Sequence, residues 1–162
     1  IQSALTGHLV FSTLHTNDAP GAVTRLVDLG VEPFLVSSSV IAVVAQRLVR
    51  VICVACKETY VPEPQPLLDL GIAPAKASRL WRGAGCSECL NSGYKGRTAI
   101  YEFLVVDDRL RDQVMSRVSS NTIKRDAVQR GMRTLRMDGA DKVLLGVTTV
   151  EEVARMTQRD NL

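Results

Sequence analysis

The chain has 162 residues, of which 46% are hydrophobic and only 4% aromatic. This length suits one ordinary domain, or one domain with a small insertion, around a core of Val, Leu, Ile and Ala. Twenty basic and 17 acidic residues give a net charge of +3, too small an excess to indicate a nucleic-acid binder by charge alone. No apolar run reaches the ~18 residues of a membrane span, and residues 1–8 lack the features of a signal peptide.

The first residues predict the end of a helix followed by a strand. Residues 1–7 are typical of a last helical turn that stops at Gly7. Because there is also no initiator Met, we expect a fragment or a cut domain. Residues 9–14 are mostly apolar and rich in strand formers, which predicts a strand buried on both faces.

Two helices are expected next. Asn17 or Asp18 can cap the first of them, and Gly30 ends it. A proline opens the second, over residues 33–50. Its middle, residues 40–45, is apolar all round and indicates deep burial. The β-branched residues there would also fit a strand, but the length and the proline start favour a helix.

The composition changes at Cys53. Residues 53–96 are rich in Pro, Gly and Cys, so we interpret them as an inserted subdomain with short helices at 67–70 and 75–80. Residues 97–106 predict a strand.

The remainder of the chain is expected to be helical. Four residues can cap its helices: Asp107, Asn121, Thr134 and Thr149. Thr149 and Glu152 have the spacing of a capping box for the last helix, residues 150–158. The fold class is therefore α/β, divided into three parts: residues 1–52, 53–96 and 97–162.

All four cysteines lie in two Cys-x-x-Cys pairs, separated by 29 residues. The two-residue spacer lets both thiolates of a pair face one point, and two pairs supply the tetrahedral ligand set that zinc prefers. The sequence predicts a closed structural zinc site made by Cys53, Cys56, Cys86 and Cys89.

Other uses of the cysteines remain open. Disulfides fit poorly with a chain that lacks a secretory signal, and a redox Cys-x-x-Cys would occur once, at a helix start. An iron–sulfur cluster is an alternative. A zinc-ribbon nucleic-acid binder or a stand-alone adaptor is the competing function class. Nearby basic residues are more simply explained as offsetting the charge of four thiolates: Lys57, Lys95 and Arg97.

The two histidines bracket the predicted first strand, and here a resemblance appears. Residues 6–19, Thr-Gly-His-Leu-Val-Phe-Ser-Thr-Leu-His-Thr-Asn-Asp-Ala, resemble the histidine box of the secretion ATPases of the type II secretion and type IV pilus systems. Residues 30–39, residues 45–50, the cysteine pairs and residues 93–98 follow in the family's order. The type II secretion branch is the most similar, and the pilus-assembly branch is the nearest alternative.

The resemblance implies the C-terminal part of a RecA-like P-loop ATPase domain, with a four-cysteine zinc subdomain and a C-terminal helical region. It further implies a cytoplasmic homohexamer, peripheral to the inner membrane, that binds membrane platform proteins and not nucleic acid. The complete protein would use ATP and Mg²⁺ to drive pseudopilus assembly. These 162 residues contain no G-x-x-x-x-G-K-[ST] phosphate loop, so the chain alone is not expected to hydrolyse ATP.

The resemblance also assigns the nucleotide site. His15 is expected near the γ-phosphate, as the candidate catalytic residue. His8 is expected to hold the histidine segment in place or to contact a neighbouring subunit. Arg47 is a candidate nucleotide contact, because its predicted helix would end near the mouth of the sheet.

Overall fold

The computed structural model describes residues 1–160. They form two compact units, which we call unit 1 (residues 1–45 and 102–132) and unit 2 (residues 46–101 and 133–160). Asn161 and Leu162, the end of the predicted part 97–162, lie outside the described residues. Among the helices of residues 1–160, none has both the length and the apolar character needed to cross a membrane.

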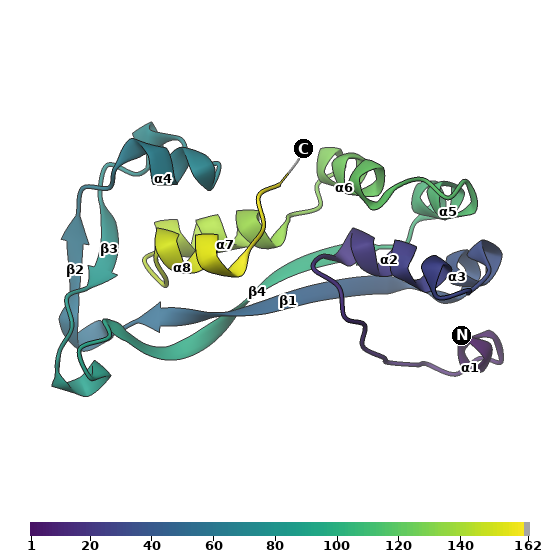
Figure 1. Cartoon of the computed structure of the whole chain (residues 1–162), viewed down its shortest axis with the longest axis horizontal. Helices are drawn as coiled ribbons and strands as arrows, with labels where there is room; N and C mark the ends of the chain where they lie inside the picture. Colours follow the sequence, from purple (N-terminus) through teal and green to yellow (C-terminus); the bar gives the residue numbers. More distant parts are fainter. Residues whose placement is uncertain (161–162) are drawn as a thin grey trace. The chain divides into compact units, whose positions relative to one another are not determined.

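Unit 1 contains five helices among the described residues (Figure 1): α1 (Gln2–Leu5), α2 (Ala19–Asp28), α3 (Pro33–Ser39), α5 (Asp108–Met115) and α6 (Ser120–Gln129). Two predicted N-caps are confirmed, since Asp18 accepts a hydrogen bond from the backbone N–H of Gly21 at 2.9 Å, and Asp107 one from that of Leu110 at 2.9 Å. The predicted cap at Asn121 is wrong. Ser119 caps α6 instead.

The core of unit 1 is aliphatic, as the composition predicts. Its buried members come from α2, α3, α5, α6 and the end of strand β4 (Tyr94–Val105): Ala19, Val23, Val36, Leu104, Val106, Leu110, Val114, Ile123 and Ala127. These side chains fix the first turn of α2 against the strand end. That turn follows directly after the segment that bears His15.

The predicted buried strand at residues 9–14 is wrong for the described chain. The segment is extended without regular secondary structure, and Leu9 and Phe11 are 72% and 89% exposed. A strand needs a neighbour to pair its backbone groups. Neither of the two sheets formed by residues 1–160 includes this segment. The apolar pattern is therefore present without the partner that would bury it.

The predicted helix over residues 33–50 is also wrong beyond its first two turns. Helix α3 ends at Ser39, and strand β1 runs from Ala42 to Ile52. The β-branched residues of this stretch fit a pleated surface and lose side-chain freedom in a helix. Pairing with β4 decided between the two periodicities.

Strands β1 and β4 form an antiparallel two-stranded sheet (Figure 1). At one end the N–H of Val106 donates to the carbonyl of Ile41, and at the other the N–H of Cys53 donates to the carbonyl of Gly93, both at 2.9 Å. The strand predicted at residues 97–106 is confirmed. Cys53 directly follows β1, and four residues separate Cys89 from the start of β4. The sheet therefore brings the two cysteine pairs to one of its ends.

Unit 2 holds the remaining elements: 3₁₀ turns η1 (Val54–Cys56), η2 (Pro74–Lys76) and η3 (Ser87–Cys89), strands β2 (Lys57–Tyr60) and β3 (Leu80–Gly83), and helices α4 (Pro64–Asp69), α7 (Leu135–Leu144) and α8 (Val150–Met156). Strands β2 and β3 pair antiparallel. The helix expected at 67–70 is confirmed within α4. The one expected at 75–80 is wrong, because only η2 forms before β3 begins.

The capping box predicted for the last helix is half formed. Thr149 accepts a hydrogen bond from the N–H of Glu152, as expected. The carboxylate of Glu152 does not turn back to Thr149. It is 1% exposed and accepts hydrogen bonds from the backbone and guanidinium of Arg50 and from Arg155. Helix α8 is thereby tied to β1 inside unit 2.

Candidate metal centre

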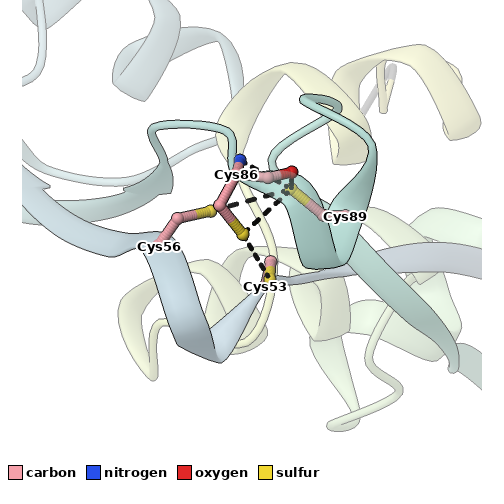
Figure 2. A group of neighbouring side chains, drawn as sticks. All are labelled: Cys53, Cys56, Cys86 and Cys89. Atoms are coloured by element: carbon pink, nitrogen blue, oxygen red, sulfur yellow. Dashed lines mark hydrogen bonds between the residues drawn. The ribbon is translucent and has the colours of Figure 1, made fainter.

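The four cysteine sulfurs of unit 2 converge on one point (Figure 2). All four Sγ atoms lie within 4.8 Å of one another. The separations are 3.9 Å for Cys53–Cys86, 3.8 Å for Cys56–Cys89 and 3.7 Å for Cys86–Cys89. The cysteines are free thiols, so the disulfide alternative is not supported.

This arrangement fits a single four-coordinate ion. A tetrahedron of sulfurs at ~2.3 Å from a central zinc has edges of ~3.8 Å, which matches the three measured separations. An iron–sulfur cluster places several iron and sulfide atoms between its thiolates and requires a wider cage. The geometry therefore favours one metal ion, and thiolate ligands select a soft or borderline cation.

Short-range backbone geometry presents each pair of thiols. The two cysteines of a pair flank a 3₁₀ turn, and the N–H of Cys56 donates to the carbonyl of Cys53 as that of Cys89 donates to Cys86. The backbone of Gly83, at the end of β3, lies against that of Gly93, just before β4. A Cβ added to Gly83 would lie 2.0 Å from the carbonyl oxygen of Gly93, so these backbones approach each other only because a side chain is missing.

Backbone amides prepare the sulfurs to carry charge. Burial disfavours the Cys89 thiolate, but N–H donation from Cys86 at 3.2 Å and Gly93 at 3.3 Å outweighs it and lowers the pKa of Cys89 to about 6. At Cys56 burial dominates over donation from Gly85 and raises the pKa to about 12. Cys89 is therefore the stronger acid of these two cysteines. A divalent cation would stabilise all four as thiolates.

Basic side chains lie near the cluster, as the sequence predicts. The ammonium group of Lys95 is 2.9 Å from a carboxylate oxygen of Glu88, which raises the pKa of Lys95, with smaller contributions from Cys53 and Cys86. Lys57 lies over the ring of Trp81, 4.6 Å from its centroid. Each of the two lysines thus has a partner within unit 2.

The predicted nucleotide-site residues lie away from the cysteines along the chain. His8 and His15 belong to unit 1 and are exposed, and the Nδ1 atom of His8 lies 3.1 Å from Oγ1 of Thr6. Arg47 belongs to unit 2, on β1. The helix that placed Arg47 near a sheet mouth does not exist, so that reason for its assignment is wrong.

Two buried carboxylates escaped the sequence interpretation. Glu102 and Glu152 are each 1% exposed. A signal was present for Glu102, a lone acid at an inward position of a strand between Ile100 and Leu104, which are both buried. Glu152 was noticed only as a helix cap, because its partner Arg50 is 102 residues away.

Comparison with known proteins identifies the family. The model of the family described as type II/IV secretion system protein matches residues 1–155. The chain is 53% identical over 160 residues to type II secretion system protein E of Pseudomonas aeruginosa, covering 99% of this chain and 32% of that protein. It is 51% identical over 158 residues to the type IV pilus assembly ATPase PilB of Thermus thermophilus, covering 96% of this chain and 18% of that protein.

A solved structure supports the fold. The X-ray structure of the ATPase DotB of Legionella pneumophila superposes with a TM-score of 0.57 at 20% identity, covering 96% of this chain and 33% of that one. The chain therefore spans about a third or less of the length of each of these proteins. With a family match over nearly all of its residues, the chain belongs to the type II/IV secretion system protein family.

Proposed function

We propose that this chain is the C-terminal portion of a hexameric ATPase that powers type II protein secretion by driving pseudopilus assembly. The observation that carries the proposal is the 53% identity to a type II secretion system protein E across nearly the whole chain. An ATPase activity is supported by the relatives named type IV pilus assembly ATPase PilB, at 51% identity, and type II secretion system ATPase E of Vibrio cholerae, at 46% identity. The activity belongs to the complete protein, since these residues contain no phosphate loop.

The proposed architecture assigns a role to each part of the chain. Residues 1–52 would complete a RecA-like core, residues 53–96 would form the zinc subdomain, and residues 97–162 would add a strand and the helical region. The exposed apolar side chains of residues 9–14 support this assignment, because they have the pattern of a core strand and would become buried beside strands contributed by other parts of the ATPase domain.

The proposed cofactors are a structural zinc ion and, in the complete protein, ATP with Mg²⁺. Zinc is favoured by the tetrahedral arrangement of the four sulfurs. Among residues 1–160, the cluster includes no His, Asp or Glu ligand besides the four cysteines. Its role would be architectural. It would hold residues 53–96 together and present them to an inner-membrane platform protein.

The proposed nucleotide site is centred on His15, near the γ-phosphate. Its support is the position of His15, exposed and three residues before the capped start of α2. His8, hydrogen-bonded close to α1, would hold the segment in place or contact a neighbouring subunit. Arg47 remains a proposed nucleotide contact on the resemblance alone.

We further propose that the protein acts in the cytoplasm, peripheral to the inner membrane, as a homohexamer. Hydrolysis would open and close subunits, and the rigid-body motion would pass to the platform protein. The proposal involves no nucleic acid.

Two measurements test the function. ATP hydrolysis is assayed on the purified complete protein, and the gene is deleted in its own host, where secreted enzymes and surface pili are quantified. We expect hydrolysis, loss of secretion and retention of pili. A complete protein that does not hydrolyse ATP contradicts the proposal.

The second candidate is a type IV pilus assembly ATPase, favoured by the 51% identity to PilB of Thermus thermophilus. The same deletion separates the two candidates. Loss of pili with intact secretion would assign the protein to pilus assembly.

A further inference from the structure

The buried carboxylate of Glu102 lies in unit 1, at the start of α2. Its Oε1 atom accepts a hydrogen bond of 2.8 Å from the backbone N–H of Ala19, a residue 83 positions earlier in the chain. Glu102 is 1% exposed and Ala19 is fully buried. Ala19 is the first residue of α2, and the loop immediately before it carries His15.

A carboxylate buried this deeply is retained only where polar groups meet it. Its neighbours on the inward face of β4, Ile100 and Leu104, are 0% and 2% exposed, and removing a charge from water costs several kcal/mol unless it is compensated. The start of α2 is one such group, since its free N–H groups and dipole favour an anion.

Capping alone does not require Glu102, because α2 already has a local cap. Asp18 accepts the N–H of Gly21 through Oδ1 at 2.9 Å. The other oxygen of Asp18 lies 3.5 Å from the ammonium group of Lys124 on α6, and the hydroxyl of Thr16 donates to the carbonyl of Asp18 at 3.2 Å. The residues just after His15 are therefore fixed from three sides: β4, α6 and their own loop.

We propose that Glu102 is a positioning residue: through the N–H of Ala19 it fixes the first turn of α2, and so the orientation of the loop that carries His15. This inference rests on the proposed ATPase function and deepens it. Glu102 does not touch the nucleotide. It acts from the core on the residue that does.

The kinetic test compares two variants of Glu102 in the complete protein. Glu102→Ala removes the acceptor and should lower kcat for ATP hydrolysis by about 10- to 100-fold, with KM changed far less, as for misplacement of a reacting group. Glu102→Gln keeps an oxygen that can accept the Ala19 N–H and should restore most of kcat. Equal losses in the two variants would contradict positioning through this hydrogen bond.

A matched control separates positioning from general destabilisation. Asp107→Ala also removes a carboxylate that caps a helix of unit 1, here α5, through the N–H of Leu110. It should lower thermal stability and leave kcat nearly unchanged. If Asp107→Ala reduces kcat as strongly as Glu102→Ala, Glu102 has only a structural role.

A double variant tests whether Glu102 acts through His15. If it does, adding Glu102→Ala to His15→Ala should lower kcat little further, because residues that work as a unit are not additive. If the fold-losses in kcat of the two single variants multiply in the double variant, the proposal is overturned.

Hydrogen–deuterium exchange of the same proteins measures how firmly the start of α2 is held, and it does not require ATP hydrolysis. Peptides that cover residues 14–22 should exchange faster in Glu102→Ala and at the normal rate in Glu102→Gln and Asp107→Ala. Unchanged exchange in Glu102→Ala overturns the inference. A complete wild-type protein that does not hydrolyse ATP contradicts the proposed function instead, and the exchange result still decides the role of Glu102.

Discussion

The cysteine cluster and the histidine segment (residues 8–16) contrast with each other. The cysteines approach within 4.8 Å of one another through two short turns and the strands beside them. The histidine segment includes a mostly apolar run, residues 9–14. It nevertheless has no regular structure and exposes Phe11 at 89%. The cluster is assembled entirely from residues of unit 2, whereas no strand among residues 1–160 pairs with the histidine segment.

The difference shows how far local information reaches. A Cys-x-x-Cys turn positions its ligands within a few residues, and two turns need only a paired strand to meet. A core strand carries no local constraint of this kind. Its conformation depends on hydrogen bonds to adjacent strands. An apolar pattern therefore does not form a strand unless other strands pair with it.

Loss of one metal ligand should have the largest effect. Cys86→Ser removes one ligand of the proposed zinc site, whose metal would contribute on the order of 10 kcal/mol, so residues 53–96 should lose their structure while unit 1 keeps its own. Limited proteolysis and zinc content measure this. In the complete protein, secretion should fall more than ATP hydrolysis.

The control for that variant is Ser87→Ala, an exposed non-ligand in the same turn. It should leave zinc content unchanged. If Cys86→Ser abolished hydrolysis by the monomeric complete protein, the cluster would belong to the catalytic machinery and the contrast with the histidine segment would fail.

Removal of the buried carboxylate of unit 2 should have the next largest effect. Glu152→Ala removes the acceptor shared by Arg50 and Arg155, whose side chains are 43% and 59% exposed and can then be hydrated. The loss of charged hydrogen bonds should therefore destabilise unit 2 by about 1–2 kcal/mol. Urea unfolding measures the loss. The exposed neighbour provides the control, since Glu151→Ala should change stability very little. Equal effects would show that the cross-link to β1 does not stabilise this unit.

Replacement of His15 should affect turnover and leave folding intact. His15→Ala in the complete protein should lower kcat by about 10- to 100-fold, equivalent to roughly 1.4–2.7 kcal/mol, with a smaller change in nucleotide affinity. Since the side chain is exposed, the melting temperature should not change. Steady-state kinetics with His8→Ala as the comparison measure this, and an unchanged kcat removes His15 from the site.

The buried carboxylate of Glu152 should also make the stability of unit 2 fall gradually at acid pH. Burial disfavours the charged form of Glu152, but the hydrogen bonds from Arg50 and Arg155 outweigh it and lower its pKa from 4.5 to about 2. A lowered folded-state pKa gives stability that is present above pH 4.5 and is lost as the pH falls toward 2. Urea unfolding from pH 5 to pH 2 should show this loss. Glu152→Gln should weaken the dependence, and an identical pH profile in that variant would contradict it.

Much of the local structure followed from the sequence. Asp18, Asp107, Thr134 and Thr149 cap the helices that they were expected to cap, because a cap requires only a short polar side chain and the next turn. The cysteine set was predicted by spacing alone, for the same reason of short range.

The tertiary structure decided what distant residues control. Residues 42–50 form a strand because β4 is available to pair with them, although their apolar run also fitted a helix. Glu102 and Glu152 became buried charges because Ala19 and Arg50 reach them from 83 and 102 residues away. Hydrogen bonds across such distances leave no periodic trace in a sequence, so only the folded chain shows which side chains they join.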